Sequence, residues 1–385
     1  MRKLTAILLA ALMLLSLSAC GGGGGGGSSG GDTIKIGWVG SLTGEQAAFG
    51  TCESQTLKLL VKQQNEAGGI LGKQIEVICY DTKGDAQEAV NAAKRLVAQD
   101  KVCSIIGPNA SGQAIAMQAV LNEYKVPDIA TVATNEKVTV QDGQLQPYNF
   151  RICFIDPQQG NIAASFIYDY LKLTEAAVLM NISDDYSQGL TKIFEQTFQQ
   201  KGGKIVAEEA FTGGDTEFTA QLTKIKESGA KIIFMPNSYQ EIINIAKQAR
   251  ALGIDATILG GDAFASDVLF DAIDVLDGSY VINHLSLNDP ELEDFRQQYK
   301  AEYGQDAAVE MNAYMVYDSF LLWKAAVEKA GSADSQAITD AITQVEVQGL
   351  TGNIKISAED HNPIGKSGCV EQVTKDGYVF ITKIS

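Results

Sequence analysis

The sequence predicts an α/β protein with two Rossmann-like lobes, whose parallel sheets are covered by helices and joined by a hinge that the chain crosses several times. Two observations lead to this fold class. Short apolar runs alternate with amphipathic helical patterns, and the alternation restarts after Arg151. The chain that follows an N-terminal leader is also too long, at about 350 residues, for one compact core.

The N-terminus predicts a secretory leader at residues 1–19. A charged start, Met1-Arg2-Lys3, precedes a short apolar run and small residues that end at Cys20. A cysteine after Leu-Ser-Ala resembles the bacterial lipobox, in which the cysteine is lipidated; an ordinary signal peptide cleaved near a cysteine is the alternative. We therefore expect a secreted protein, anchored by lipid at Cys20 to the extracytoplasmic face of the bacterial cell membrane.

Residues 20–31 consist of Cys20 and an almost pure Gly/Ser segment. Such a segment has no side chains to bury and is typical of a flexible tether. A glycine run also occurs in phosphate-binding loops, but no predicted strand precedes this one and no Lys-Ser/Thr pair follows it. We interpret it as a tether.

The first block predicts strands at residues 34–40, 75–80 and 102–106, because each is a short apolar run. Between the first two, an amphipathic helix ends at Ala67-Gly68-Gly69, where glycine suits a left-handed cap. A second helical pattern, 89–97, precedes the third strand.

The second block repeats this alternation after residue 151. The predicted elements, in chain order, are strand 177–182, helix 189–200, strand 205–211, helix 218–228, strand 231–235, helix 240–252 and strand 257–259.

The last segment, from about Asn283, contains a long helical pattern at 310–330 and strand-like pieces at 352–356, 369–373 and 378–384. It is too small for a third layered domain, so we expect it to complete the other two. The predicted lobes are 32–152 with 283–348, and 153–282 with 349–385. Their strand ends then face each other across one cleft, where open α/β sheets bind ligands.

Composition argues against nucleic acid as a partner. The chain has 30 basic and 47 acidic residues and a net charge of −17, and loss of the leader makes it more negative. A surface this acidic repels phosphate backbones and anionic lipid.

Cysteine and histidine are poorly suited to metal or redox chemistry here. Five cysteines follow Cys20, an odd number without CxxC spacing, so at least one stays free or pairs elsewhere. Cys153 and Cys369 can meet at the hinge, but spacing does not fix the pairing. The two histidines, His284 and His361, are interpreted as surface or turn residues. We expect no metal and no cofactor.

The predicted strand ends are rich in hydroxyls, amides and carboxylates. Ser111 and Gly112 precede a helical pattern at 113–122, and a helix N-terminus favours an anion such as a carboxylate. Asp262 ends the last strand of the second block and can pair with an ammonium group. Helix capping by Ser111 and a plain turn at Asp262 are the alternatives. Together the two sites describe a zwitterion, and Phe49 and Tyr186 are candidate apolar walls.

Several motifs run in the same order through nearly the whole chain after the leader, and they resemble the branched-chain amino acid receptor family. This is the Leu/Ile/Val-binding type of ABC-transporter solute-binding protein, with the type I periplasmic binding protein fold. The motifs are Ser41-Leu42-Thr43-Gly44 with Phe49-Gly50, Asn65-Glu66-Ala67-Gly68-Gly69-Ile70, Ile105-Ile106-Gly107-Pro108, Ala133-Thr134-Asn135, Phe154-Ile155-Asp156-Pro157-Gln158-Gln159-Gly160, Asp185-Tyr186-Ser187-Gln188-Gly189 and Leu259-Gly260-Gly261-Asp262.

The resemblance implies that Ser111, the Val132 backbone and Thr134 hold the carboxylate and amino groups of an amino acid. Asp262 would complete the ammonium site, where other members often carry Glu. Many members have two adjacent tyrosines where this chain has Ser238-Tyr239, and this departure leaves the substrate open.

The resemblance also implies Phe49 and Tyr186 as pocket aromatics, a neutral amino acid as first-choice ligand, an ABC permease as partner, and ligand-driven closure of the hinge. We expect a monomer. The alternatives are a sensory module for amides or small carboxylates and an enzyme that uses Asp184, Asp185 or Asp262 as acid or base. The enzyme is disfavoured because no nucleophile motif is present and histidine is scarce.

Overall fold

The structure is a computed structural model that describes residues 33–384. The predicted signal peptide at 1–19, Cys20 and the Gly/Ser segment to residue 31 lie outside these residues. Between residues 33 and 384, no helix combines the length and the apolar character needed to cross a membrane.

The first lobe is built on a five-stranded, all-parallel sheet in the order β2-β1-β3-β4-β7. Its strands are β1 (Ile34–Gly40), β2 (Ile75–Asp81), β3 (Ser104–Ile106), β4 (Asp128–Ala130) and β7 (Asn149–Arg151). Residues 102 and 103, which the apolar pattern included in a strand, instead follow an irregular helical turn at Leu96–Asp100. The short strands β4 and β7 were not predicted.

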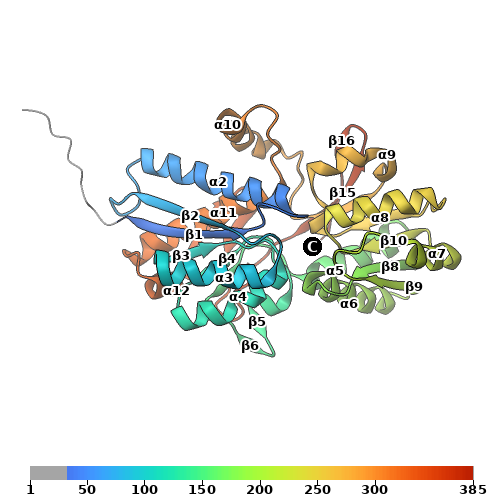
Figure 1. Cartoon of the computed structure of the whole chain (residues 1–385), viewed down its shortest axis with the longest axis horizontal. Helices are drawn as coiled ribbons and strands as arrows, with labels where there is room; N and C mark the ends of the chain where they lie inside the picture. The colour runs from blue at the N-terminus through green and yellow to red at the C-terminus, as the bar shows by residue number, and fades with distance from the viewer. Residues whose placement is uncertain (1–32, 385) are drawn as a thin grey trace, which may run out of the picture. The chain divides into compact units, whose positions relative to one another are not determined.

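Helices cover both faces of this sheet (Figure 1). One face packs against α2 (Ala47–Glu66) and α11 (Met311–Ala330), and the other against α3 (Ala86–Arg95) and α4 (Ser111–Tyr124). The chain leaves α2 through Gly68 and Gly69, whose φ angles of 104° and 79° favour glycine, as the sequence predicted. The helices therefore bury both faces of the central strands, as is usual for a parallel sheet.

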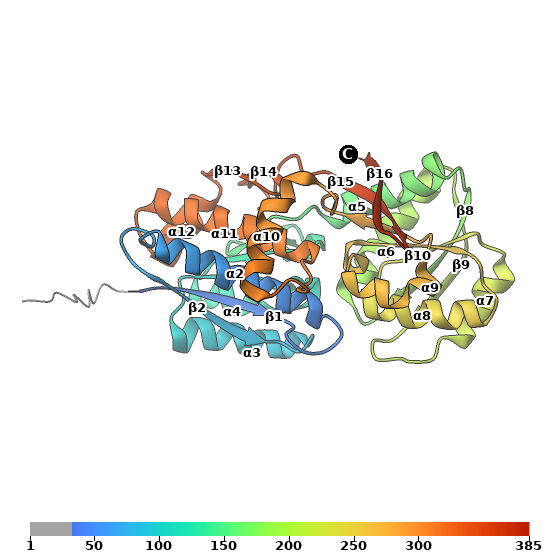
Figure 2. The ribbon, with the colours of Figure 1, turned by 90° about the horizontal axis from the view of Figure 1, so that it is seen from above.

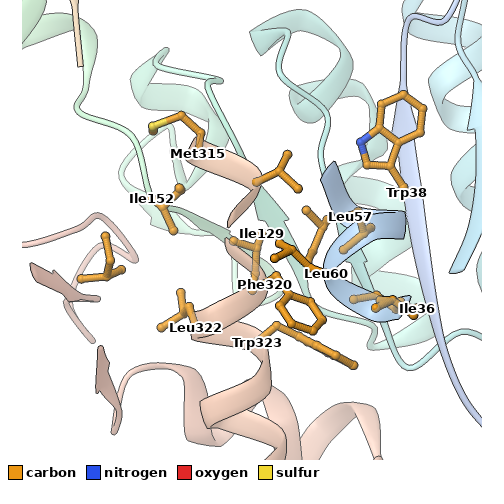
Figure 3. Packing of buried hydrophobic residues seen from close by; sticks show 14 of the residues in the cluster. Ile36, Trp38, Leu57, Leu60, Ile129, Ile152, Met315, Phe320, Leu322 and Trp323 are labelled. Atoms are coloured by element: carbon orange, nitrogen blue, oxygen red, sulfur yellow. The ribbon is translucent and has the colours of Figure 1, made fainter. Parts of the chain in front are cut away.

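The main core of the first lobe lies between β1, α2 and α11 (Figure 3). Ile36 and Trp38 from β1 meet Leu57 from α2 and Trp323 from α11, and all four side chains are fully buried. The predicted third segment therefore supplies much of this core. Its helices α10 (Glu293–Tyr303) and α12 (Ser335–Ile342) also pack on the first lobe.

The second lobe is built on a seven-stranded sheet in the order β16-β15-β12-β11-β10-β8-β9. Five neighbouring strands run parallel, and two C-terminal strands join antiparallel at one edge. The parallel strands are β8 (Glu175–Asn181), β9 (Lys204–Phe211), β10 (Ile232–Met235), β11 (Thr257–Gly260) and β12 (Tyr280–Asn283); the others are β15 (Gly368–Thr374) and β16 (Gly377–Ile384).

The second sheet is covered by α5 (Asp156–Ser165) and α6 (Asp185–Gln200) on one face, and by α7 (Thr219–Ser228) and α8 (Tyr239–Ala251) on the other. Figure 2 shows the two groups of helices on either side of the strands. This architecture confirms the predicted fold class, two α/β lobes with parallel strands.

The chain passes between the lobes at residues 152–155, 284–292 and 357–367. The small ribbon of β13 (Glu346–Gly349) and β14 (Gly352–Lys355) places Ile354 in the first-lobe core. The boundary expected at 348–349 therefore does not coincide with the packing, because residues 349–356 lie with the first lobe. The apolar pattern of 352–356 does not show which core receives it.

All five cysteines within the described residues are unpaired, including Cys153 and Cys369 near the crossings. Burial raises the pKa of the Cys153 thiol to about 12, so it remains protonated at neutral pH.

Candidate functional site

A cavity lies between the two lobes, at the carboxyl ends of their strands. Both lobes contribute to its wall, which consists of Gln46, Phe49, Asn109, Ala110, Ser111, Val132, Asp184, Tyr186, Ser238, Asp262, Ala263, Met311 and Asn312.

Ser111 lies at the first-lobe end of this cavity, at the first position of α4. Ala110 is the N-cap of α4 and has no side chain that can accept from the helix, so Ser111 does not act as the cap. The Ser111 Oγ instead accepts a hydrogen bond from the Asn135 backbone N–H at 3.2 Å. The hydroxyl hydrogen and the first backbone N–H groups of α4 are thus left to bind an anion.

Asp262 faces the cavity from the second lobe, directly after β11. Its Oδ1 accepts from the Ala263 N–H at 3.0 Å, and its own N–H donates to Gln159 Oε1 at 2.8 Å. The carboxylate is 1% exposed, and no lysine or arginine between residues 33 and 384 is paired with it. An ammonium group in the cavity would offset the cost of burying this charge.

His284 holds the other oxygen of Asp262, with 2.9 Å between His284 Nε2 and Asp262 Oδ2. The imidazole stacks on Phe154 with ring centroids 3.7 Å apart. Burial lowers the pKa of His284, although Asp262 opposes this, so the ring is neutral near pH 7 and donates without adding a positive charge.

The histidines were interpreted as surface or turn residues. Both lie in bends of the chain, but neither is at the surface, because each is buried against an aromatic ring. His284 follows the apolar run of β12, so the rule that polar residues at strand ends face the cleft would have found it had β12 been predicted. His361 stacks on Phe150 and bonds the Asn149 carbonyl oxygen at 3.0 Å, away from the cavity.

Aromatic side chains close two sides of the cavity. Phe49, from the start of α2, packs edge to face against Tyr239 of α8, with ring centroids 4.9 Å apart. Phe49 lines the cavity, whereas Tyr239 stands behind it and accepts from the Ala48 N–H at 3.4 Å. Tyr186 lines the cavity from the second lobe, and its hydroxyl donates to Gln159 Oε1 at 3.4 Å.

Of the eight candidate ligand-binding residues, the cavity therefore brings together six, which are Phe49, Ser111, Val132, Tyr186, Ser238 and Asp262. Tyr239 and Thr134 are the exceptions. Thr134 is fully buried beside Asp156. Burial raises the pKa of the Asp156 carboxyl to about 8, and the contact with Thr134 offsets only part of this rise. Ser238 mainly caps α8: its Oγ accepts from the Glu241 N–H at 3.5 Å, and its own N–H donates to Glu241 Oε2 at 3.0 Å.

The cavity also includes residues that were not proposed for the site. Asn109 and Asp184 belong to strand ends that the sequence marked as polar, so the same signal covers them. Met311 and Asn312 enter from the start of α11, a helix far along the chain. No strand ends there, so a rule based on strand ends does not find them.

Asp184 and Asp185, the other candidates for acid or base, start α6. Asp184 accepts from the Tyr186 N–H at 3.2 Å as the helix N-cap, and burial raises its pKa to about 7. No group of three or more His, Cys, Asp or Glu side chains is placed to hold a metal within residues 33–384.

Contacts between the lobes surround the cavity. Asn135 Nδ2 of the first lobe donates to the Asp185 carbonyl oxygen of the second at 2.7 Å. On another side, Glu310 accepts from Ser266 Oγ and the Asp267 N–H, each at 3.1 Å. Burial raises the pKa of Glu310 to about 8.

Comparison with protein families gives a match to the periplasmic binding protein model over residues 33–377. A Leu/Ile/Val-binding protein of Rhizobium johnstonii is 31% identical over 80% of this chain and 83% of its own. A leucine-, isoleucine-, valine-, threonine- and alanine-binding protein of Pseudomonas aeruginosa is 26% identical over 84% of this chain and 85% of its own.

Among solved structures, a branched-chain amino acid transporter substrate-binding protein of Streptococcus pneumoniae in complex with isoleucine has a TM-score of 0.83 and 32% identity. The alignment covers 92% of this chain and 100% of the other.

Proposed function

The chain belongs to the periplasmic binding protein family, and from this premise we propose that it is the extracytoplasmic solute-binding component of an ABC importer that captures a neutral, branched-chain-like amino acid. Proteins of this kind bind their substrates and are not enzymes. Members named for Leu, Ile and Val binding support the ligand class.

One observation carries the proposal: opposite charges of an amino acid have complementary sites on opposite lobes. The uncapped N-terminus of α4 with Ser111 suits the α-carboxylate, and Asp262, satisfied by a neutral His284, suits the α-ammonium group. A ligand that spans both sites stabilises the closed arrangement of the lobes. An ABC permease in the membrane would then recognise this form.

The remaining parts of the proposal concern the environment of the protein. Lipidation at Cys20 would hold it at the outer face of the cell membrane, and the Gly/Ser segment after Cys20 would separate it from the lipid surface. We propose that it acts as a monomer. Mass spectrometry of the membrane-extracted protein tests the lipid, since the expected product starts at a diacylated Cys20.

A thermal-shift panel of single amino acids tests the ligand class, using the chain from Gly21 to Ser385. Binding to the folded state adds about 2.7 kcal/mol at a hundredfold excess over Kd, which moves the midpoint by several degrees. Asp262→Asn should abolish the shift, whereas the exposed Asp271→Asn should retain it. If no amino acid shifts the midpoint of the unchanged protein, the amino-acid assignment fails.

A further inference from the structure

Asn312 is a buried amide in the cavity wall that the two charged sites do not use. It lies in the first turn of α11, is 1% exposed and lines the cavity beside Met311. Its Oδ1 has no hydrogen-bond partner within the described residues. A buried acceptor left unpaired is costly, and native proteins rarely keep one without a reason.

Glu53 fixes which end of this amide faces the cavity. The Asn312 Nδ2 donates to Glu53 Oε1 at 2.8 Å, and Glu53 also accepts from Thr131 Oγ1 at 2.8 Å and Trp38 Nε1 at 3.3 Å. An ionised carboxylate only accepts, and the indole N–H only donates, so the Asn312 nitrogen must face Glu53. The oxygen is thereby left for the cavity.

Two other amides in the wall, Gln46 and Asn109, also have buried oxygens without partners. No hydrogen bond within the described residues fixes which end of either side chain is the oxygen, and either can turn to suit a ligand. Of these three amides, only Asn312 has the position of its oxygen fixed by a hydrogen bond to a neighbouring side chain.

We propose that Asn312 selects a ligand whose side chain carries a hydrogen-bond donor, so that the preferred substrate is a neutral amino acid with a hydroxyl or amide group rather than a purely aliphatic one. This inference rests on the proposed function, which assigns the ligand's two charged groups to Ser111 and Asp262. The side chain is then the part of the ligand left to meet the wall formed by Phe49, Met311 and Asn312.

Matched pairs of amino acids distinguish a donor from shape. Threonine and valine have nearly the same shape, but threonine replaces a methyl group with a hydroxyl. O-methylthreonine and isoleucine form a second pair, in which the added oxygen only accepts. We expect threonine to bind about 3- to 10-fold more tightly than valine, the usual gain from one neutral hydrogen bond. O-methylthreonine should bind no more tightly than isoleucine.

Titration calorimetry on the Gly21–Ser385 chain measures all four affinities. It is done at pH 8 because burial raises the pKa of Glu53 to about 7, and above this value the carboxyl is mostly ionised. Asn312→Leu should remove the threonine preference or reverse it. Asn353→Leu, the same change at an exposed residue of β14, should leave all four affinities unchanged.

Glu53→Gln gives a second variant that leaves Asn312 in place. A glutamine there can donate to the Asn312 oxygen and turn the amide, so that its NH₂ faces the cavity. O-methylthreonine should then gain affinity relative to isoleucine. Circular dichroism of each variant without ligand reports whether it folds. The comparison of the four amino acids on the unchanged protein tests the proposal even if a variant fails to fold.

The outcomes separate the two proposals. Valine binding as tightly as threonine to the unchanged protein overturns the role of Asn312 and leaves the proposed function standing. A threonine preference that persists in Asn312→Leu also overturns it. If none of the four amino acids nor any other binds, the proposed function itself fails.

Discussion

Tyr239 is the residue through which contact between the lobes can be tested apart from contact with the ligand. It does not line the cavity, yet its ring packs edge to face on Phe49 of the opposite lobe, 4.9 Å between centroids, and its hydroxyl accepts from the Ala48 N–H at 3.4 Å. If ligand binding closes the cleft, Tyr239→Leu weakens the closed form and therefore the affinity.

The magnitude follows from the geometry. An edge-to-face aromatic pair contributes about 0.5–1.5 kcal/mol beyond the area that it buries, and the 3.4 Å contact to Ala48 adds little. A total of about 0.5–1.5 kcal/mol raises Kd roughly 2- to 13-fold. Tyr239→Phe keeps the ring and loses only the hydroxyl, so it should change Kd by less than about twofold.

Calorimetry measures Kd of the tightest-binding amino acid for the unchanged protein, Tyr239→Leu and Tyr239→Phe. Urea unfolding without ligand measures the free energy of unfolding of the same three proteins. An unchanged Kd for Tyr239→Leu would refute the role of this contact in closure. A loss of unfolding free energy as large as the loss of binding energy would show that the contact is formed without ligand.

Three further predictions follow from the structure. Gly261→Ala would place a methyl group on the Tyr186 hydroxyl and beside Gln159, so it should weaken ligand binding by roughly 5- to 160-fold in calorimetry, because overpacking costs about 1–3 kcal/mol. Leu322→Ala should lower the free energy of unfolding by about 2–5 kcal/mol in urea, since this fully buried side chain fills the first-lobe core. Burial raises the pKa of Asp156 and of Glu310 to about 8, so near pH 7 the folded state holds protons that the unfolded state has released. The free energy of unfolding should therefore fall as the pH rises from 7 to 8.5. A rise of the unfolding free energy over that window would contradict this assignment.

The sequence predicts the long, regular elements of this fold well. β1 was placed at residues 34–40 and lies there, and α11 was placed within one residue of its start, because each has a long apolar pattern; α11 also ends at Gly331, which is left-handed. The strands β4, β7 and β12 were missed. Length alone is not the cause, because β3, β10 and β11 are as short and were predicted. β4 (Asp-Ile-Ala) and β7 (Asn-Phe-Arg) mix polar with apolar residues and therefore form no apolar run.

The site was predicted in part for the same reason. Ser111 and Asp262 follow strands that the sequence shows, and both lie in the cavity. Asn312 and His284 depend on how distant segments pack. Asn312 lies at a helix start that meets Glu53 across the first lobe, and His284 follows β12, a strand that was not predicted. Tyr239 lies near the cavity but does not line it, and its ring packs on Phe49, which does.

The order of synthesis does not match the order of assembly in this protein. The sheet of the first lobe is complete in sequence at Arg151, but the helix that covers one of its faces begins only at Met311. The second sheet likewise waits for β15 and β16, the final hairpin. During translation at about 5–20 residues per second, apolar surface on both lobes therefore stays uncovered until nearly the whole chain has emerged. A chain released before Gly368 would have a finished first lobe attached to an open sheet edge, which is a substrate for proteases and for aggregation.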